Sequence, residues 1–527
     1  MNTLAVVHSR ALFGLSAPPV SVEVHLANGL PAFHIVGLPE TSVRESRERV
    51  RAALLQSGLD FPNRRITVNL APADLPKESG RFDLPIAIGI AAAAGHLPLA
   101  ALTDVELVGE LSLSGELRPI RAALAVAAGV AQASPGHSLI LPRSNLDEAL
   151  PGGLTRLHAA QHLREVIEHL KGVRPLVNDA LAADAALPSA PDTTQAFGAA
   201  TNLPGDEAGL DMADVIGQPL ARRALEIAAA GRHTLLFTGS PGTGKSLLAH
   251  RLAGLLPPLT HEEALDVAMI RSACGQPALL SSRPLMRSPH HSITAAGLLG
   301  GGHPPRPGEI SLAHHGILFL DELTEFRRPV IEALREPLET GEITLSRGGT
   351  RETYPARFLL VAAMNPCPCG YLGDPARSCR CTPAQIRRYQ SRLSGPLLER
   401  FDLGVEMIRE HVGCNAASAA ARPESTAAIA QRVLAAHQRQ QDRQGCHNAH
   451  LPAGRFDTCL PLTPAARKLL TQAAERFAWS VRSQHKCLRV ARTIADLDDS
   501  PTLEATHLAE AMALRRPLDH LHLAEAA

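Results

Sequence analysis

The sequence predicts an α/β fold class, in which a parallel α/β core lies between an N-terminal α+β domain and a C-terminal helical region. A short apolar run at 234–238 is followed by a glycine-rich segment and then by a helical run at 247–255. Two more largely apolar runs, 317–320 and 357–364, are each followed directly by polar residues. Runs of this kind are typical of buried parallel strands, and helices between them indicate a sheet covered by helices.

Composition divides the chain into parts. Residues 1–170 alternate short strands and helices, whereas 171–208 are rich in Ala, Pro, Asp, Ser and Thr, as linkers often are. Strand and helix signals resume over 209–410, and residues 411–527 are mainly helical in pattern. We therefore expect an N-terminal domain, a linker, an α/β core and a helical lid.

Bulk properties restrict the class of protein. Lys and Arg number 52, as do Asp and Glu, so no global basic field indicates nucleic acid, and an anionic partner must meet a local patch. The N-terminus lacks the pattern of a secretory signal. The apolar stretch 84–102 contains His96 and two prolines, which favours a buried helix over a membrane span. Four of the nine cysteines are clustered, which indicates metal in a reducing compartment, with the cytoplasm as the expected location.

The glycine-rich segment is a candidate phosphate-binding loop. It matches G-x-x-x-x-G-K-[ST] and lies between a strand and a helix, the context that this pattern requires. Backbone N–H groups and the helix N-terminus would hold the phosphates of ATP, Lys245 would reach the β- and γ-phosphates, and Ser246 would bind Mg²⁺. The predicted ATP-binding residues are Gly239, Ser240, Pro241, Gly242, Thr243, Gly244, Lys245 and Ser246.

Polar residues at the ends of the other two strands complete the predicted site. Asp321 and Glu322 follow the apolar run 317–320, at the strand end where open α/β sheets bind ligands. Asp321 would hold Mg²⁺ and Glu322 would orient the attacking water. Asn365 follows the third strand, where it would sense the γ-phosphate or position water. A local turn at Asn365, aided by Pro366, is an equally good interpretation from these residues alone.

Four cysteines lie on one short segment. Cys367 and Cys369 form one C-x-C pair, Cys379 and Cys381 form another, and nine residues separate the two pairs. Four thiolates suit tetrahedral Zn²⁺, so we expect a structural zinc site. The alternatives are four reduced thiols or a redox pair.

These residues resemble a known family. The segment DVIGQ (214–218), followed by the phosphate-binding loop, the acidic pair and Asn365, is similar to AAA+ ATPases. More narrowly, six segments resemble the magnesium-chelatase-like family of bacterial proteins known as YifB or ComM. These are GLPETSVRESRERV (37–50), VNLAPADLPK (68–77), PHHS (289–292), PGEISLAH (307–314), SGPLLERFD (394–402) and LRVARTIADL (488–497). The resemblance implies a homo-hexameric ring that binds ATP between subunits and drives DNA branch migration during recombination or natural transformation.

The resemblance also implies two arginine roles. Arg400 would be the arginine finger that reaches the ATP of the neighbouring subunit, where a guanidinium offsets developing charge. The alternative is a structural arginine paired with Asp402 or Glu399. Arg489 would be sensor 2 and touch nucleotide in cis, although Arg482 and Arg492 are competing candidates.

Two segments are candidate DNA-contacting loops. The first is an insert that includes His290 and His291 and the Gly- and Pro-rich stretch 300–308, and it resembles the helix-2 insert of one AAA+ clade. The second, 341–354, has the alternation of a β-hairpin around Gly-Gly, like a pre-sensor-1 hairpin. In a ring both would face the pore, where Arg347 would meet phosphates. A surface hairpin with a solvated Arg347 is the alternative.

Residues 66–145 resemble a Lon-type protease domain. That chemistry needs a Ser nucleophile and a Lys base within hydrogen-bond reach. The Ser position falls at or near Asp83 and the Lys position at or near Leu124, and Ser79 with Lys77 is a poor replacement. We therefore expect a catalytically inactive domain.

Together these features predict a cytoplasmic, hexameric AAA+ ATPase that moves on single-stranded or branched DNA and does not enter membranes. Two other functions stay open. One is a chelatase subunit that supports Mg²⁺ insertion into a porphyrin, and the other is a regulator or chaperone that acts on protein.

Overall fold

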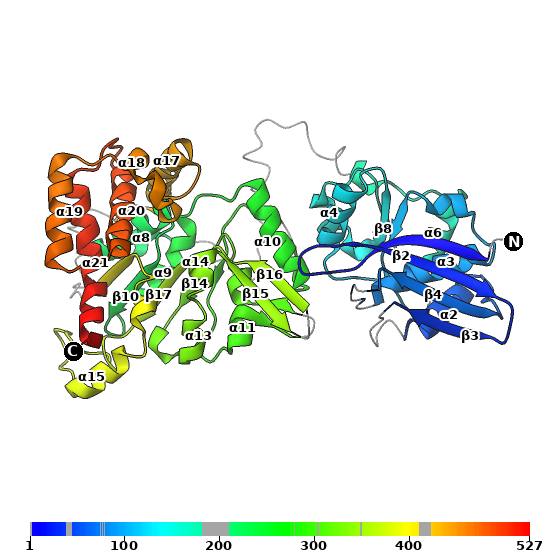
Figure 1. Cartoon of the computed structure of the whole chain (residues 1–527), viewed down its shortest axis with the longest axis horizontal. Helices are drawn as coiled ribbons and strands as arrows, with labels where there is room; N and C mark the ends of the chain where they lie inside the picture. Colours follow the sequence, from blue (N-terminus) through cyan, green and yellow to red (C-terminus); the bar gives the residue numbers. More distant parts are fainter. Residues whose placement is uncertain are drawn as a thin grey trace. The chain divides into compact units, whose positions relative to one another are not determined.

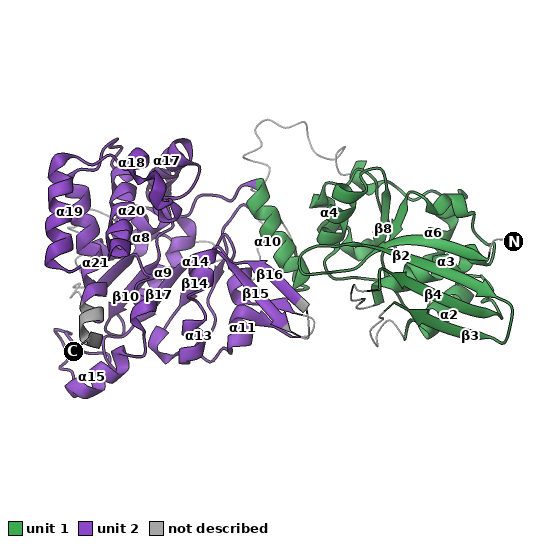
Figure 2. Ribbon diagram, viewed as in Figure 1, with its two compact units in different colours: residues 1–199, 261–281 green, residues 200–260, 282–527 purple. Residues whose placement is uncertain are grey.

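The computed structural model describes residues 3–37, 45–73, 75, 77, 80–181, 210–278, 280–302, 305–347, 350–409 and 423–526 (Figure 1). The chain forms two compact units (Figure 2). The first unit comprises residues 1–199 and 261–281, and the second comprises 200–260 and 282–527. The chain therefore leaves the second unit at 261 and re-enters it at 282.

The first unit is built on a seven-stranded mixed sheet with the order β3-β4-β2-β1-β5-β8-β9. Its strands are β1 (Leu4–Arg10), β2 (Pro19–Ala27), β3 (Ala32–Val36), β4 (Arg65–Ala71), β5 (Val105–Leu107), β8 (Ser138–Pro142) and β9 (Leu157–Ala160), with a separate small hairpin of β6 (Glu110–Leu111) and β7 (Leu117–Arg118). Strand β2 runs antiparallel to β1 and β4, whereas β5, β8 and β9 continue parallel to β1.

Helices cover this sheet. They are α2 (Ser46–Gln56), α3 (Asp83–Ala93), α4 (Ala123–Ala133), α5 (Leu146–Ala149) and α6 (Leu163–Leu170). Every residue of α3 is buried. This confirms a buried helix for the first part of the apolar stretch 84–102, because α3 ends at Ala93.

Helix α10 (His261–Ala273) belongs to the first unit although its sequence lies within the 209–410 stretch. It packs against α4, and Leu124 of α4 forms a small buried cluster with Ala268 and Ala278. The Ser272 hydroxyl donates a hydrogen bond to Glu148, which also accepts one from the Ala123 N–H. Apolar and polar contacts together hold this segment in the first unit.

The second unit contains a five-stranded parallel sheet with the order β11-β14-β17-β10-β18. Its strands are β10 (Leu235–Gly239), β11 (Met286–Arg287), β14 (Ile317–Leu320), β17 (Leu359–Met364) and β18 (Leu403–Met407). The three strands predicted from apolar runs are confirmed as β10, β14 and β17. Each has a buried interior of Leu, Val, Ile, Phe or Ala, which a sheet covered on both faces requires.

Short elements and two hairpins surround this sheet. They are α8 (Pro219–Gly231), α9 (Lys245–Arg251), α11 (Ala295–Leu299), α12 (Glu309–Leu312), α13 (Arg328–Glu332), α14 (Pro337–Thr340), α15 (Pro383–Gln390), α16 (Gly395–Leu398), the hairpin of β12 (Gly300–Gly301) and β13 (Arg306–Pro307), and the hairpin of β15 (Glu342–Arg347) and β16 (Thr350–Pro355). The predicted hairpin at 341–354 is confirmed, with Arg347 paired to Thr350, and its Gly-Gly turn lies outside the described residues.

The C-terminal part is helical, as expected. It consists of α17 (Thr426–Gln444), α18 (Phe456–Cys459), α19 (Pro464–Arg476), α20 (Val481–Leu497) and α21 (Ala505–Ala526). Helix α20 packs against α8, α17 and α21, and α21 also contacts β18 (Figure 1). These helices share one hydrophobic core with β10 and β18, so they are joined closely to the α/β sheet.

Candidate active site

The ends of three neighbouring strands bring the predicted catalytic residues together. Strand β17 lies between β10 and β14, with Met364 opposite Thr238 and Ala362 opposite Leu320. Because all three strands run parallel, the residues that follow them emerge at one edge of the sheet. This edge therefore carries the glycine-rich loop, the acidic pair and Asn365.

The glycine-rich loop needs glycine at defined positions. Gly242 and Gly244 have φ angles of +81° and +91°, in the left-handed region that favours glycine. A Cβ atom on Gly239 would lie 2.5 Å from the Met407 carbonyl oxygen of β18. The turn thus brings the chain directly from β10 into α9, which begins at Lys245.

Lys245 is buried and points into the loop. Its Nζ donates to the carbonyl oxygens of Gly239 and Ser240, at 2.6 and 3.0 Å, and to Asn365 Oδ1 at 3.2 Å. Burial lowers the pKa of Lys245, while the charges of Asp321 and Glu322 oppose that shift. The same ammonium group can exchange these neutral acceptors for phosphate oxygens, which offer full negative charge.

Ser246 and Asp321 form the other half of this cluster. The Ser246 hydroxyl donates to Asp321 Oδ2 at 2.5 Å, and the Glu322 N–H donates to Asp321 Oδ1 at 2.9 Å. A hydroxyl and a carboxylate side by side are oxygen ligands of the type that Mg²⁺ prefers. Glu322 has a left-handed φ of +51°, an unusual conformation for a non-glycine residue, and its side chain is 55% exposed.

His291 lies beside Glu322. Its Nδ1 is 3.5 Å from Glu322 Oε2, and its ring stacks at 4.0 Å between centroids on His290, whose Nδ1 contacts the Ser292 hydroxyl. The sequence predicted a DNA-contacting role for both histidines. In the structure His291 contacts Glu322 of the candidate site, a contact that the insert's sequence did not indicate. The DNA-contacting role of both histidines stays a prediction.

Arg400 forms an ion pair with Glu339, a residue distant from it in the sequence. Its Nη2 lies 2.5 Å from Glu339 Oε2, and Arg482 Nη2 lies 3.3 Å from the other oxygen of Glu339. Burial, and then the charge of Arg482, lower the pKa of Arg400. The carboxylate partner is thus Glu339, rather than the Asp402 or Glu399 that nearness in sequence suggested. Two arginines from distant segments therefore share one exposed carboxylate.

A buried ion pair holds the backbone next to Arg400. Lys486 of α20 lies 2.7 Å from Asp402 Oδ1 and also donates to the Arg400 carbonyl oxygen at 2.8 Å. Although burial opposes ionisation of the carboxyl, the charge of Lys486 keeps the pKa of Asp402 well below its usual value. This pair joins the start of β18 to the helical region.

The other two sensor candidates make contacts within the helical region. Arg489 donates to the Leu451 carbonyl oxygen at 3.0 and 2.7 Å and lies over the Phe456 ring. Arg492 is buried and pairs with Asp496 at 2.7 Å. Both are tied to local partners, whereas Arg482 is 43% exposed and shares Glu339 with Arg400.

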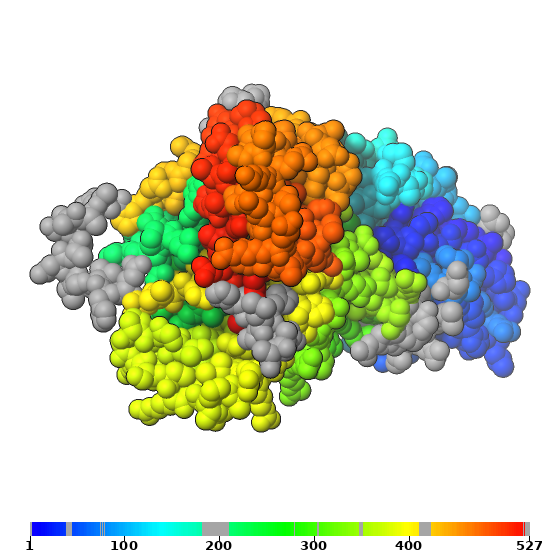
Figure 3. Space-filling view, turned by 60° about the vertical axis from the view of Figure 1, so that its left-hand side comes forward, coloured from blue at the N-terminus to red at the C-terminus, as the bar shows by residue number. Residues whose placement is uncertain are grey.

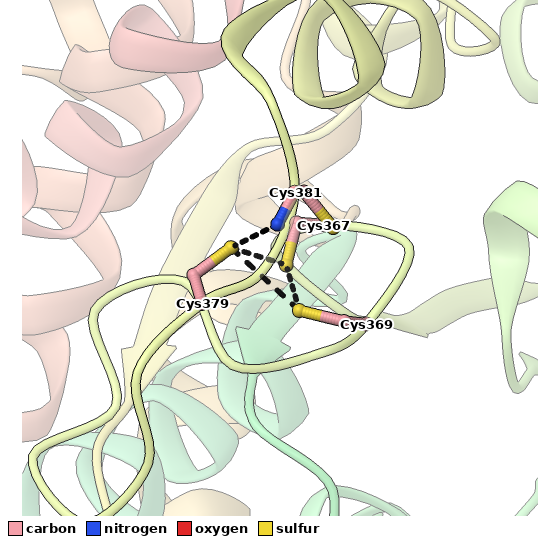
Figure 4. A group of neighbouring side chains, drawn as sticks. All are labelled: Cys367, Cys369, Cys379 and Cys381. Atoms are coloured by element: carbon pink, nitrogen blue, oxygen red, sulfur yellow. Dashed lines mark hydrogen bonds between the residues drawn. The ribbon is translucent and has the colours of Figure 1, made fainter.

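The four predicted zinc ligands converge (Figure 4). The Cys367 sulfur is 3.4 Å from that of Cys369 and 3.6 Å from that of Cys379, and all four sulfur atoms lie within 4.8 Å of one another. A disulfide would bring two sulfurs to about 2.05 Å, whereas Zn–S bonds of ~2.3 Å in a tetrahedron separate them by about 3.8 Å. Hydrogen bonds from the backbone of Arg380, and then of Tyr371, lower the pKa of Cys369 to about 6.

The segment that carries the four cysteines, residues 367–381, is here called the cysteine loop, and it also contacts the glycine-rich loop. Gly370 has a φ of +83°, and a Cβ atom there would lie 2.7 Å from Pro241 Cδ. The Ser240 side chain is the main cause that lowers the pKa of Asp374, and Arg409 donates to the Pro241 carbonyl oxygen at 2.9 Å. No motif predicts this contact; the only local signal is the glycine directly after the first C-x-C pair.

In the first unit, Asp83 and Leu124 are the positions at or near which the resemblance to a Lon-type domain placed the catalytic Ser and Lys. Asp83 is buried and accepts hydrogen bonds from Ser46 and from Arg49 Nε, while burial raises its pKa. Leu124 packs beneath α10. Lys77 is buried and donates to the Pro72 carbonyl oxygen, and Ser79 lies outside the described residues.

Comparison with known proteins identifies the family. Residues 211–414 match the family described as magnesium chelatase, subunit ChlI, residues 22–145 match subunit ChlI of Mg-chelatase, and residues 423–515 match the C-terminal part of that subunit. The YifB proteins of Salmonella typhimurium and Escherichia coli are each 45% identical, over 98% of this chain and 99% of theirs. Competence protein ComM of Haemophilus influenzae is 45% identical over 97% of both chains. The chain belongs to the magnesium-chelatase-like family of YifB and ComM proteins.

More distant relatives match only part of the chain. The magnesium-chelatase 38 kDa subunit of Cereibacter sphaeroides is 26% identical over 37% of this chain and 57% of its own length. The fold is that of a mixed α/β protein with a parallel sheet and a helical C-terminal region, consistent with magnesium-chelatase-like AAA+ proteins. Among the described helices, none combines the length and the apolar character needed to cross a bilayer.

Proposed function

We propose that this chain is an ATP-driven DNA translocase of the AAA+ class that promotes branch migration in recombination and natural transformation. The observation that carries the proposal is near-full-length similarity to a competence protein. The geometry supports it, because Lys245, the acidic pair and Asn365 lie together at one edge of the sheet. Single-stranded or branched DNA is the proposed polymer, and the cytoplasm is the proposed location.

Each residue at the edge has a role in this proposal. Lys245 and the backbone of 239–246 bind the phosphates of ATP, and Ser246 with Asp321 would hold Mg²⁺, which neutralises phosphate charge when bound. Glu322 accepts a proton from the attacking water as the water oxygen bonds to the γ-phosphorus, while the bond from that phosphorus to the β–γ bridging oxygen breaks and ADP leaves with the electron pair. Asn365, already hydrogen-bonded to Lys245, positions that water or a γ-phosphate oxygen.

The proposed active form is a homo-hexamer, because an arginine from a neighbouring subunit would complete each site. We assign this role to Arg400. In the single chain its guanidinium is held by Glu339 together with that of Arg482, so Arg482 is positioned to act beside it. Arg489 remains the proposal from family resemblance for sensor 2, although its contacts lie at Leu451 and Phe456.

The proposed parts of the chain follow the family. Residues 1–170 would form a Lon-like domain without protease activity, 171–208 a linker, 209–410 the AAA+ core, and 411–527 the helical lid. A carboxylate at 83 held by Arg49 and a leucine at 124 cannot supply a Ser–Lys pair. His290, His291 and the β15–β16 hairpin with Arg347 remain proposed contacts to DNA in the pore.

We also propose a structural zinc ion at Cys367, Cys369, Cys379 and Cys381, because their sulfur separations approach those of a tetrahedral site. Protein purified without chelator should contain about one zinc per chain by atomic emission. Cys379→Ser should abolish that zinc and Cys446→Ser, outside the cluster, should retain it. Metal-free protein with four freely titratable thiols here would exclude the site.

Strand displacement from a four-way DNA junction, measured with ATP and Mg²⁺, tests the main proposal. Wild-type protein should displace the strand, and Lys245→Ala and Glu322→Gln should not. Peptide cleavage should be absent in all three. ATP hydrolysis that responds to neither single-stranded nor branched DNA would contradict the proposal and favour a chelatase-type or protein-directed motor.

A further inference from the structure

The segment that begins within the cysteine loop and continues through α15 is strongly basic, although the whole chain is neutral. Residues 375–398 contain five arginines and no lysine or acidic residue. All five arginine side chains are exposed. A zinc ion bound by four thiolates has a net charge of about −2, which still leaves this segment positive. The segment, with α15 at its centre, lies at the surface of the second unit (yellow in Figure 3).

Three of these arginines have no acidic partner among the described residues. Arg380 lies between two of the cysteines, and Arg387 and Arg388 are adjacent on α15. Arg377 instead donates to the Tyr371 hydroxyl, and Arg392 pairs with Glu325 at 3.3 Å. Exposed arginines without a carboxylate partner are suited to bind phosphate, which the guanidinium contacts in bidentate fashion.

Residues at the end of α15 hydrogen-bond to the segments that follow β14 and β17 at the candidate site. The buried Tyr389 accepts a hydrogen bond from the Thr324 hydroxyl, two residues after Glu322. Arg392 donates to the Thr324 carbonyl oxygen at 2.9 Å, and Gln390 donates to the Pro366 carbonyl oxygen, next to Asn365, at 3.0 Å. Helix α15 thus exposes Arg387 and Arg388 to solvent. Its last two residues contact the segments that follow β14 and β17.

We propose that Arg380, Arg387 and Arg388 form a binding surface for the phosphate backbone of nucleic acid, here named the arginine face. We further propose that Tyr389 is a positioning residue, through which occupancy of this face changes the turn after Glu322. The inference rests on the proposed function, because it takes nucleic acid as the polymer. It adds a contact outside the candidate pore loops and a route by which DNA stimulates ATP hydrolysis.

The test uses full-length protein with a forked DNA and measures affinity against salt concentration, together with basal and DNA-stimulated ATP hydrolysis. Arg387→Ala/Arg388→Ala should lower DNA affinity, and the slope of log K against log salt should decrease by about 2, roughly one for each lost phosphate contact. Basal hydrolysis should stay unchanged. The matched control is Arg467→Ala/Lys468→Ala, an adjacent exposed basic pair on α19, which should leave the slope unchanged.

Tyr389→Phe removes only the hydroxyl that contacts Thr324. It should retain DNA affinity but lose at least half of the DNA stimulation, a split that mere destabilisation would not produce. If wild-type protein binds DNA and the Arg387/Arg388 variant keeps its affinity and slope, the inference is wrong while the proposed function stands. If wild-type protein binds no DNA, both fail. If Arg387→Ala/Arg388→Ala loses its oligomeric state in sedimentation but keeps the slope of log K against log salt, the arginine face is a contact between subunits and the inference is overturned.

Discussion

The buried pair between Asp402 and Lys486 should be a major contribution to the stability of the second unit. Asp402→Asn keeps the size of the side chain but removes the charge that compensates the Lys486 ammonium group. Lys486 is 10% exposed and Asp402 is 12% exposed, so water can replace little of what is lost. Breaking such a pair on one side destabilises proteins by about 3–5 kcal/mol. For a unit of this size that corresponds to a decrease in melting temperature of roughly 10 °C.

Differential scanning calorimetry of the full chain provides the measurement, because the unfolding of the second unit should move while that of the first stays in place. Adding Lys486→Met to Asp402→Asn should recover part of the loss, and with the single variant Lys486→Met it completes the cycle that gives the coupling energy of the pair. Arg164→Ala, which breaks the exposed pair with Glu168 on α6, is the control, with an expected cost below ~0.5 kcal/mol. A cost below about 1 kcal/mol for Asp402→Asn would refute the reasoning.

The same pair predicts a dependence on pH. The folded pKa of Asp402 is lowered relative to the unfolded chain, so its contribution is fully present above the unfolded value of about 3.9 and is lost as pH falls. The difference in melting temperature between wild-type protein and Asp402→Asn should therefore be constant from pH 5 to 7 and decrease at lower pH. A difference that grows on acidification would contradict this assignment.

Three further predictions concern the catalytic edge. Glu322→Gln should reduce ATP hydrolysis by about 10²–10⁴ in a phosphate-release assay while a fluorescent nucleotide still binds; loss of binding would mean that Glu322 is structural. His291→Ala should lower basal kcat, because His291 Nδ1 lies 3.5 Å from Glu322 Oε2; reduced DNA affinity with unchanged basal kcat would show that His291 contacts DNA alone. Gly370→Ala should destabilise its turn by about 1–2 kcal/mol and weaken nucleotide binding several-fold, because the new Cβ would press on Pro241; nucleotide affinity equal to wild type would show that the loop tolerates the shift.

Local patterns were sufficient to predict which strands end at the candidate site. The strands that end near Gly239, Asp321 and Asn365 could be recognised because a buried parallel strand needs a continuous apolar run, and a ligand site needs polar groups where that run ends. The convergence of the four cysteines was predictable for a similar reason, since their spacing confines them to one short loop. In both cases the sequence pattern lies within a few residues of the groups that it positions, so a local pattern is enough to predict them.

Contacts between distant segments could not be predicted in the same way. Arg400 and Arg482 meet at Glu339, which lies 61 residues before the first and 143 before the second. No periodicity or local motif encodes such a pairing, because it depends on how α14, α16 and α20 are placed by the common core. The Gly370–Pro241 contact and the His291–Glu322 contact have the same origin.

The membership of α10 in the first unit has a practical consequence for dissecting this protein. A cut in the 182–209 stretch would appear from sequence to separate an N-terminal domain from an ATPase. It would in fact leave 261–281 on the ATPase fragment, with Ala268 and Ala278 exposed after the loss of Leu124. The N-terminal fragment would in turn lack the partner of Glu148. Because the two units are interleaved in sequence, a fragment of the first unit that keeps its own contacts has to include residues 261–281.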